Sequence, residues 1–385
     1  SLGDLIYSQT QNWEDIYNNS TVRQHVVNTS QGMKTPAVYA QYKADKKYRD
    51  ALANGIDHMG IDHGRIDGLP NSDEAARDNR STRGSETCGT VEGLMSTEIA
   101  MKIIGEAWMG DRLETLAYNA LPAAYPSDYS GHTYYILQNQ VVDTLGNHEF
   151  DCDHGDSSAF GAPLGFDCCF ANNHMGWAKF VQNMWMATAE GGLALTAYGP
   201  NHVTAKVAGG KTAKFQQETD YPFRDTVNLT YYGEDAEFDL KLHIPEWAKT
   251  AQLMVNGTAY QGVKAGEFYT IRRNWTKEDK VTAVFKSEVE LTTWYNNSTA
   301  VQKGALVYGL QIDEDWRTYE ENDARELKVE HKDGFPLREV YPASAWNYGL
   351  LTGKSASFEV IETEEVGLQP FQAETAPIQI KAKGQ

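Results

Sequence analysis

The spacing of apolar residues changes at residues 191–192, and this change limits what the chain can fold into. Before it, apolar residues recur every three or four positions, most regularly over 177–185, which predicts a helix that Gly191 and Gly192 terminate. After it, apolar and polar residues alternate, as over 238–244, which predicts β-strands. The chain is therefore expected to be an α+β protein in which a helical part precedes a sheet part.

Turn and cap signals divide both parts further. The helical part is predicted to contain these other helices: 25–33, 36–42, one capped by Asp45, 91–99 and 113–121. Thr35 is expected to cap the second of these helices. Gly110-Asp111 is expected to interrupt helical structure before the last of them. In the sheet part Asn256-Gly257 predicts a hairpin. Further strands are predicted at 281–285 and 305–310. Several short strands separated by turns indicate an antiparallel β-sandwich.

Length and charge narrow the class of protein. A chain of 385 residues, 41% of them hydrophobic, is long enough for two ordinary cores, so two domains are the first expectation. The formal net charge of -19, without a basic cluster, disfavours nucleic acid and anionic membranes as partners. No apolar run is long enough to cross a bilayer, and no basic-then-apolar leader is found. Four cysteines, two of them adjacent, do not form a disulfide framework.

The adjacent Cys168 and Cys169 are the strongest chemical signal in the sequence. Cys88 follows Glu86 by two residues, so that a thiol and a carboxylate can turn toward one metal ion. Adjacent cysteines do not easily close a relaxed disulfide, and thiolates with one carboxylate suit a tetrahedral zinc site. The alternative interpretation is that the pair is simply two small, buried and inert side chains.

The stretch 122–167 is predicted to be a long loop, rich in Tyr, His, Asn and Asp, and loops of this length are commonly functional. The remaining cysteine, Cys152, lies in its acidic segment 151–156. The spacing of the acids there fits no oxygen-ligand pattern, so a solvated turn is the preferred interpretation.

Six short runs along the chain carry a resemblance. In order they are Asn71-Ser72-Asp73-Glu74, Ser85-Glu86-Thr87-Cys88, Cys168-Cys169-Phe170-Ala171-Asn172, Gly176-Trp177-Ala178-Lys179-Phe180, Ile244-Pro245-Glu246-Trp247 and Val255-Asn256-Gly257. Together they resemble glycoside hydrolase family 127, which includes the beta-L-arabinofuranosidases. The resemblance implies an (alpha/alpha)6 barrel followed by antiparallel β-sandwich domains. Too few helices precede Trp13 for six helical hairpins, so the front of the barrel is expected to be absent. The expected domains are a barrel portion at 1–192, a sandwich at 193–333 and a segment at 334–385 that packs back on them.

The resemblance also implies functional residues. The metal ligands would be Glu86, Cys88, Cys168 and Cys169, with zinc as the ion. Cys168 would be the nucleophile of a retaining glycosidase, in place of the usual carboxylate. This chemistry is coherent because zinc deprotonates a coordinating thiol, which makes a thiolate available at neutral pH.

The remaining candidates each have a plain structural alternative. Asp73 and Glu74 compete for the acid/base role, and the resemblance favours Glu74, although an Asp-Glu pair before a helix is also typical of a solvated turn. His25 matches a histidine that lines the sugar site in the resembled family, but a single helical histidine is often only a core or surface residue. His132 and Tyr134, in the long loop, are candidates for binding sugar hydroxyls or for simple packing.

Three functions from different classes fit these residues. The first is a zinc-thiolate glycoside hydrolase that releases a terminal sugar, with L-arabinofuranose as the candidate, from an oligosaccharide or polysaccharide. The second is a non-catalytic carbohydrate-binding protein in which zinc is structural. The third is a zinc hydrolase that acts through an activated water molecule. A periplasmic or secreted location follows from the substrate class as an expectation.

Overall fold

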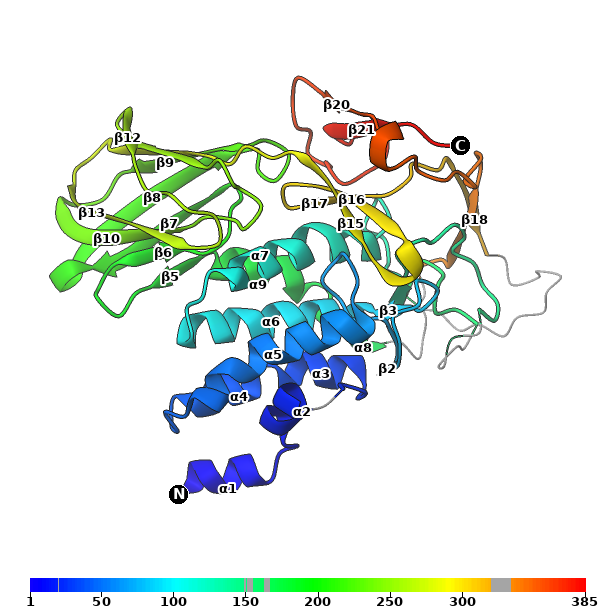
Figure 1. Cartoon of the computed structure of the whole chain (residues 1–385), viewed down its shortest axis with the longest axis horizontal. Coiled ribbons are helices and arrows are strands. Elements are labelled where there is room, and N and C mark those ends of the chain that lie inside the picture. Colours follow the sequence, from blue (N-terminus) through cyan, green and yellow to red (C-terminus); the bar gives the residue numbers. More distant parts are fainter. Residues whose placement is uncertain (20, 149, 151–154, 163–166, 320–333) are drawn as a thin grey trace.

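A helical body followed by β-sheets makes up the chain, as the change in periodicity predicts (Figure 1). The structure is a computed structural model, and it describes residues 1–385 except 20, 149, 151–154, 163–166 and 320–333. In Figure 1 the helices occupy the lower centre, the two largest sheets lie at the upper left, and the C-terminal strands lie at the upper right. The N-terminus lies at the far end of the helical body from the C-terminus.

The helical body is organised around α6, which contacts α3, α4, α7, α8 and α9. Its helices have the following bounds: α1 Leu2–Ser8, α2 Trp13–Asn19, α3 Val26–Gly32, α4 Lys34–Ala40, α5 Lys46–His63, α6 Thr87–Ile103, α7 Trp108–Thr115, α8 Asp167–Asn172 and α9 Met175–Asn183. A π-helical turn, Leu116–Ala120, continues α7. Contacts with five other helices hold α6, and with it the residues at its N-terminal end, in place within the helical body.

Two local predictions in this part were wrong because tertiary contacts outweigh local signals. Helix α4 begins at Lys34, so Thr35 lies inside it and does not cap it. Gly110 lies within α7 and does not break the chain. A Cβ atom at Gly110 would lie 2.5 Å from the carbonyl oxygen of Thr196 and 2.8 Å from the ring of His243. Glycine is thus needed there for close packing of α7 against the sheets.

Two further predictions about helix ends had different outcomes. Asp45 does cap α5, since its carboxylate accepts a hydrogen bond from the backbone N–H of Lys47 at 3.1 Å. Helix α9 ends at Asn183, earlier than predicted, and Trp185 instead begins a strand. The Trp185 ring stacks on Phe215 with centroids 5.5 Å apart, so burial against the sheets decides its conformation.

Two sheets follow the helical body and share one hydrophobic core. The four-stranded sheet has the order β13-β10-β6-β5, and the six-stranded sheet has the order β12-β11-β14-β9-β8-β7. Their strands are β5 Trp185–Ala187, β6 Leu193–Leu195, β7 Asn201–Val207, β8 Lys211–Thr219, β9 Thr226–Tyr231, β10 Ala236–His243, β11 Gln252–Val255, β12 Thr258–Tyr260, β13 Phe268–Trp275 and β14 Lys280–Val284. Phe215 and Trp275 meet edge to face across the core at 5.3 Å.

The prediction that the sheets are purely antiparallel needs a correction. Strand β10 pairs with β6 in parallel, with Leu240 opposite Leu193, while its other neighbour β13 is antiparallel. The connection from β6 to β10 passes through the three strands β7 to β9 of the other sheet, and this crossover allows the parallel pair. The hairpin predicted at Asn256-Gly257 is confirmed: it joins β11 to β12, with both residues at positive φ.

The described C-terminal strands form three small sheets. They are β15 Val289–Thr293 with β16 Thr299–Lys303 and β17 Leu306–Tyr308, β18 Glu314–Thr318 with β19 Arg338–Pro342, and β20 Phe358–Glu362 with β21 Ile378–Ala382. Strand β19 also makes single bridges to Asp143 and Phe160 in the long loop of the helical body. The end of the chain therefore reaches back to the loop that follows α7.

Buried polar groups join α7 to the sheets. The Glu114 carboxylate accepts a hydrogen bond from the backbone N–H of Tyr198 at 2.9 Å and another from the Tyr221 hydroxyl. Asp111 lies 3.3 Å from the Nε2 atom of the fully buried His243 on β10. Burial raises the pKa of Glu114 to about 7, because desolvation disfavours its charged form more than these partners favour it.

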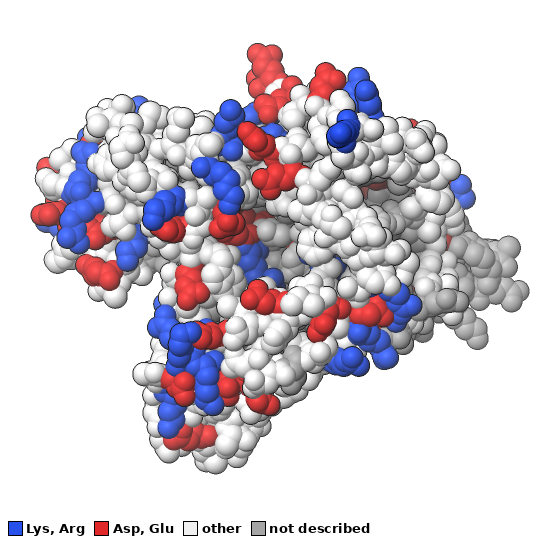
Figure 2. All heavy atoms as spheres, in the orientation of Figure 1, with Lys and Arg blue, Asp and Glu red and all other residues white. Residues whose placement is uncertain are grey.

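The surface is acidic overall but mixed in sign. Figure 2 shows Lys and Arg interspersed with Asp and Glu over the visible face, in keeping with a net charge of -19 that is spread out. Among the described helices, none is both long and apolar enough to cross a membrane.

Candidate active site

A small four-stranded sheet at one end of α6 positions the candidate residues. Its strands are β1 Ser72–Asp73, β2 Ala75–Ala76, β3 Ser85–Glu86 and β4 Tyr135–Ile136, in the order β2-β1-β3-β4. Strand β3 runs directly into α6, so Glu86 occupies the N-cap position of the helix and Cys88 is its second residue. Both side chains are buried. The positive end of the helix dipole favours negative charge at this position.

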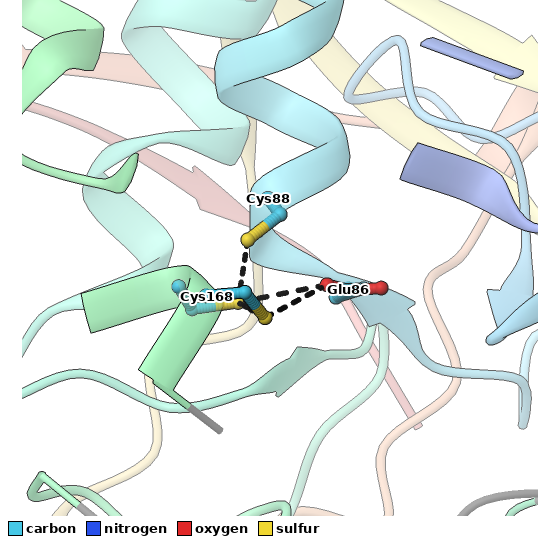
Figure 3. Close-up of side chains that lie close together, drawn as sticks. Glu86, Cys88 and Cys168 are labelled. Atoms are coloured by element: carbon cyan, nitrogen blue, oxygen red, sulfur yellow. Dashed lines mark hydrogen bonds between the residues drawn. The ribbon is translucent and has the colours of Figure 1, made fainter. Parts of the chain in front are cut away.

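Helix α8 brings the adjacent cysteines to the same point, as the spacing and the resemblance predict. The Sγ atom of Cys169 lies 3.1 Å from that of Cys88, and the Sγ atom of Cys168 lies 3.4 Å from Oε1 of Glu86. The Sγ atoms of the adjacent pair are 4.0 Å apart. In Figure 3 the Cys88 side chain points toward the adjacent cysteines, and the Cys168 side chain points toward Glu86. All four ligand atoms lie within 4.8 Å of one another.

The electrostatics of this group favour a bound cation. Hydrogen bonds from Cys169 and Cys88 lower the pKa of Cys168, so the exposed thiol is the one that carries the negative charge. Burial, together with the nearby charge of Cys168, raises the pKa of Glu86 to about 8. The buried Oε2 atom of Glu86 has no hydrogen-bond partner among the described residues. A cation among the four ligand atoms would offset the negative charges of Cys168 and Glu86 and would give the buried Glu86 carboxylate a partner.

Glu74 lies beside this group on a strained turn. It is the single residue between β1 and β2, and its φ of 76° is unusual for a residue other than glycine. The turn is held by a 2.7 Å hydrogen bond from the N–H of Val26 to the Glu74 carbonyl oxygen. Backbone strain of this kind is often found at functional sites, where the surrounding structure maintains it.

Three side chains donate hydrogen bonds to the Glu74 carboxylate. Oε1 accepts from the hydroxyls of Tyr134 at 2.5 Å and Tyr135 at 3.0 Å, and Oε2 lies 2.7 Å from Nε2 of His25. Burial opposes ionisation of Glu74, but these hydrogen bonds outweigh it and hold the pKa of Glu74 below its ordinary value. The resting carboxyl group is therefore ionised, whereas a role as proton donor requires it to be protonated.

His25 connects Glu74 to the cysteine cluster. Its Nδ1 atom accepts a hydrogen bond from the N–H of Val27 at 3.2 Å and so caps α3, which leaves Nε2 as the protonated nitrogen of the neutral ring. Nε2 lies 2.7 Å from Glu74 and 3.6 Å from Oε2 of Glu86. The hydrogen bond with Glu74 raises the pKa of His25, against an opposing effect of burial. One imidazole thus lies between the two carboxylates.

The structure separates the roles of Asp73 and Glu74. Asp73 is buried, and its carboxylate accepts hydrogen bonds from Arg83 at 2.6 Å and from the N–H of Gly84 at 2.7 Å. These contacts tie β1 to the chain segment that leads into β3. Asp73 therefore acts as a structural anchor, whereas the Glu74 carboxylate contacts His25, which in turn lies 3.6 Å from Glu86.

His132 is buried near the cluster, and the charge of Cys168 acts on it. Its Nδ1 atom lies 3.1 Å from the carbonyl oxygen of Gly161, and its Nε2 atom has no hydrogen-bond partner among the described residues. Burial lowers the pKa of His132, so its ring is neutral. Tyr134, by contrast, is engaged directly with Glu74.

Sequence reasoning missed some contributors to the site. Tyr135 donates to Glu74, although it is adjacent to the predicted Tyr134 and shares its residue type. The amide of Asn172, one turn after Cys168, lies 3.5 Å from Sγ of Cys88. Asn172 lies four residues after Cys168, so both lie on the same face of a helix, and this spacing could have identified Asn172 from the sequence. The fourth cysteine, Cys152, lies outside the described residues.

Comparison with known proteins identifies a family model and solved structures that this chain resembles. The model of the GH127 beta-L-arabinofuranosidase middle domain matches residues 192–287, which confirms the resemblance to glycoside hydrolase family 127. A GH127 beta-L-arabinofuranosidase from Geobacillus stearothermophilus T6 has a similar fold, with a TM-score of 0.63 and 19% identity over 88% of this chain and 62% of that one. A second glycoside hydrolase has a TM-score of 0.62 and 17% identity, over 87% of this chain and 66% of that one.

A third structure, a GH127 beta-arabinofuranosidase, has a TM-score of 0.60 and 17% identity over 86% of this chain and 60% of that one. At these identities the likeness establishes the fold. The chain spans about two thirds or less of the length of the structures it matches. No curated protein sequence matches the chain significantly.

Proposed function

We propose that this chain, whose residues 192–287 match the GH127 middle domain, is a retaining glycoside hydrolase that removes a terminal sugar from a glycan. The first candidate for that sugar is beta-L-arabinofuranose. The observation that carries the proposal is that the exposed Cys168 thiol and the hydrogen-bonded Glu74 carboxylate are linked through Glu86 and His25 in one group of side chains. A nucleophile and an acid/base group beside each other are what retaining hydrolysis requires.

We infer that the metal ion is zinc, held by Glu86, Cys88, Cys168 and Cys169. Three sulfur atoms and one oxygen are a soft donor set, which suits zinc better than magnesium or calcium. Tetrahedral coordination with Zn–S bonds of about 2.3 Å places ligand sulfurs about 3.8 Å apart. The observed Sγ–Sγ distances of 3.1 and 4.0 Å bracket that value. When bound, the ion would keep Cys168 as a thiolate at neutral pH.

The reaction would proceed in two steps. In the first, the Cys168 sulfur attacks the anomeric carbon, the glycosidic C–O bond breaks, and the Glu74 carboxyl group gives its proton to the leaving oxygen. In the second, water attacks the anomeric carbon, the C–S bond breaks, and the Glu74 carboxylate accepts a proton from that water. The lowered pKa of Glu74 suits the second step directly.

The protonated state that the first step needs would depend on the neighbours of Glu74. A glycosidic oxygen that enters the site can only accept hydrogen bonds, so it competes with the Glu74 carboxylate for the hydroxyls of Tyr134 and Tyr135. The loss of such donors raises the pKa of a carboxyl group. His25 and Tyr134 would then bind hydroxyls of the terminal sugar, and His132 would bind a hydroxyl of the glycan next to it.

The family fold, an (alpha/alpha)6 barrel followed by β-sandwich domains, remains part of the proposal. The helices grouped around α6 and the two sheets with a common core support it.

Sugar release by the purified chain with zinc tests the proposal on a panel of aryl glycosides. Cys168→Ala should abolish turnover, by about a thousandfold or more, and should still bind the sugar. Glu74→Gln should mainly slow the cleavage of poor leaving groups, because a good leaving group needs no proton. Cys152→Ala, which changes the cysteine outside the proposed ligand set, is the matched control and should keep wild-type turnover.

Three results would contradict the proposal. Unchanged turnover in Cys168→Ala would show that Cys168 is not the nucleophile. A zinc content near zero in the active protein would show that the four proposed ligands do not hold zinc during catalysis. Binding of sugar without any turnover in the wild-type chain would instead favour a non-catalytic carbohydrate-binding protein.

A further inference from the structure

The chain after the sandwich returns to the candidate active site and is firmly attached there. Arg338 of β19 bridges Phe160, and its guanidinium group contacts both carboxylate oxygens of Asp128 at 3.0 Å. Next to it, Leu337 is fully buried in a small core with Leu145 and other residues of the long loop. Segment 334–338 is therefore fixed against the long loop that also carries His132.

This attachment places two aromatic rings together beside the cysteine cluster. Phe170 follows the adjacent cysteines on α8, and Phe335 comes from the returning segment. Their rings meet edge to face with centroids 6.0 Å apart. The Phe170 ring also meets His132, at 6.3 Å. Both phenylalanines are unusually exposed for their type, at 41% and 36% of their surfaces.

His132 adds a defined polar group to the two rings. A carbonyl oxygen can only accept, so the Nδ1 atom that faces Gly161 carries the hydrogen of the neutral ring. The Nε2 atom is then a lone-pair acceptor, and it is buried without a partner among the described residues. A buried acceptor of this kind requires a donor to offset its desolvation, and a hydroxyl group can supply one.

We propose that Phe170, Phe335 and His132 form a subsite for the sugar unit next to the one that is cleaved. This inference rests on the proposed function. An enzyme that removes a terminal sugar encloses that sugar, so exposed groups at the entrance contact the rest of the glycan. The rings would pack on the C–H face of the neighbouring sugar, which is drawn to the negative face of an aromatic ring, and His132 would accept a hydrogen bond from one of its hydroxyls.

Two substrates with the same terminal sugar test the subsite. One is the methyl glycoside, which has nothing to place in the subsite, and the other is a disaccharide. The quantity measured is the ratio of kcat/KM for the disaccharide to kcat/KM for the methyl glycoside. Phe335→Ala should lower this ratio about three- to tenfold, the usual effect of losing one aromatic contact. Phe335→Trp should restore most of it.

The matched control is Tyr348→Ala, which removes another exposed aromatic ring of the C-terminal region and should leave the ratio unchanged. An equal loss on both substrates in Phe335→Ala, with no change in the ratio, would refute the subsite while leaving the proposed function intact. If the wild-type chain cleaves neither substrate, the proposed function is wrong and the subsite with it. The double variant His132→Phe with Phe335→Ala should have a lower ratio than Phe335→Ala alone. If the two variants have the same ratio, His132 is not part of the subsite.

Discussion

Replacement of Glu114 by glutamine should change how the stability of the protein depends on pH. Glu114 is buried where α7 meets the sheets, and its pKa is raised from 4.5 to about 7 by desolvation. Glutamine is nearly the same size and keeps an oxygen that can accept the hydrogen bond from Tyr198. The variant therefore removes the ionisation while preserving most of the packing.

The sign and size of the change in unfolding free energy follow from the pKa values of Glu114 in the unfolded and folded states. Because the folded pKa is raised, the stabilising contribution of protonated Glu114 is fully present below pH 4.5 and is lost as the pH rises through about 7. A difference of about 2.5 pKa units corresponds to roughly 3 kcal/mol at about 1.4 kcal/mol per unit. Wild-type protein should thus lose up to about 3 kcal/mol of unfolding free energy between pH 5 and pH 8 that Glu114→Gln does not lose.

Urea unfolding followed by tryptophan fluorescence measures this difference at both pH values. The comparison of wild type with variant cancels the other titrating groups, and Glu288→Gln, at an exposed position, serves as the control. The free-energy difference between wild type and Glu114→Gln should shift by a few kcal/mol in favour of the variant from pH 5 to pH 8. A difference that stays constant across this range would refute the burial argument for this interface.

Three further perturbations have defined outcomes. Arg83→Gln should lower the unfolding free energy by about 3 kcal/mol, and Arg83→Lys by less, because the guanidinium group pairs with the buried Asp73 at 2.6 Å; an effect below about 0.5 kcal/mol in urea unfolding would contradict this. Gly110→Ala should cost about 1 to 3 kcal/mol, since its Cβ would lie 2.5 Å from a backbone oxygen that cannot move freely, and a thermal midpoint equal to wild type would show that α7 can shift. Cys88→Ser should lower the zinc content measured by atomic emission, whereas zinc retention at the wild-type level would exclude Cys88 as a ligand.

The sequence predicted the cluster of Glu86 and the three cysteines, whereas several predicted element boundaries were wrong. The Glu86-x-Cys88 spacing and the adjacency of Cys168 and Cys169 are local facts, and each pair remains close in any helical or turn conformation. Three of the wrong boundaries, at Thr35, Gly110 and Trp185, lie where a local cap or period signal competes with packing against another element. Local preferences are worth about 1 kcal/mol or less, so burial overrides them.

Only the tertiary structure could choose between chemically equal residues. Asp73 and Glu74 are adjacent carboxylates, and apart from the family resemblance, which favours Glu74, the residues themselves do not tell which one faces the site. The positive φ of Glu74 turns it toward His25, while Arg83 holds Asp73 on the other side. A one-residue turn projects consecutive side chains in different directions, and long-range contacts decide which direction is inward.

What the sequence determined by itself is the chemistry available: one helical half, one sheet half, and three thiols with a carboxylate that suit a soft metal ion. The tertiary structure decided which groups meet. Packing of α8 on α6 joins cysteines 81 positions apart, and the return of the chain brings Phe335 to Phe170. The reason is that bonded neighbours limit spacing within a segment, whereas the meeting of distant segments depends on apolar burial summed over the whole core.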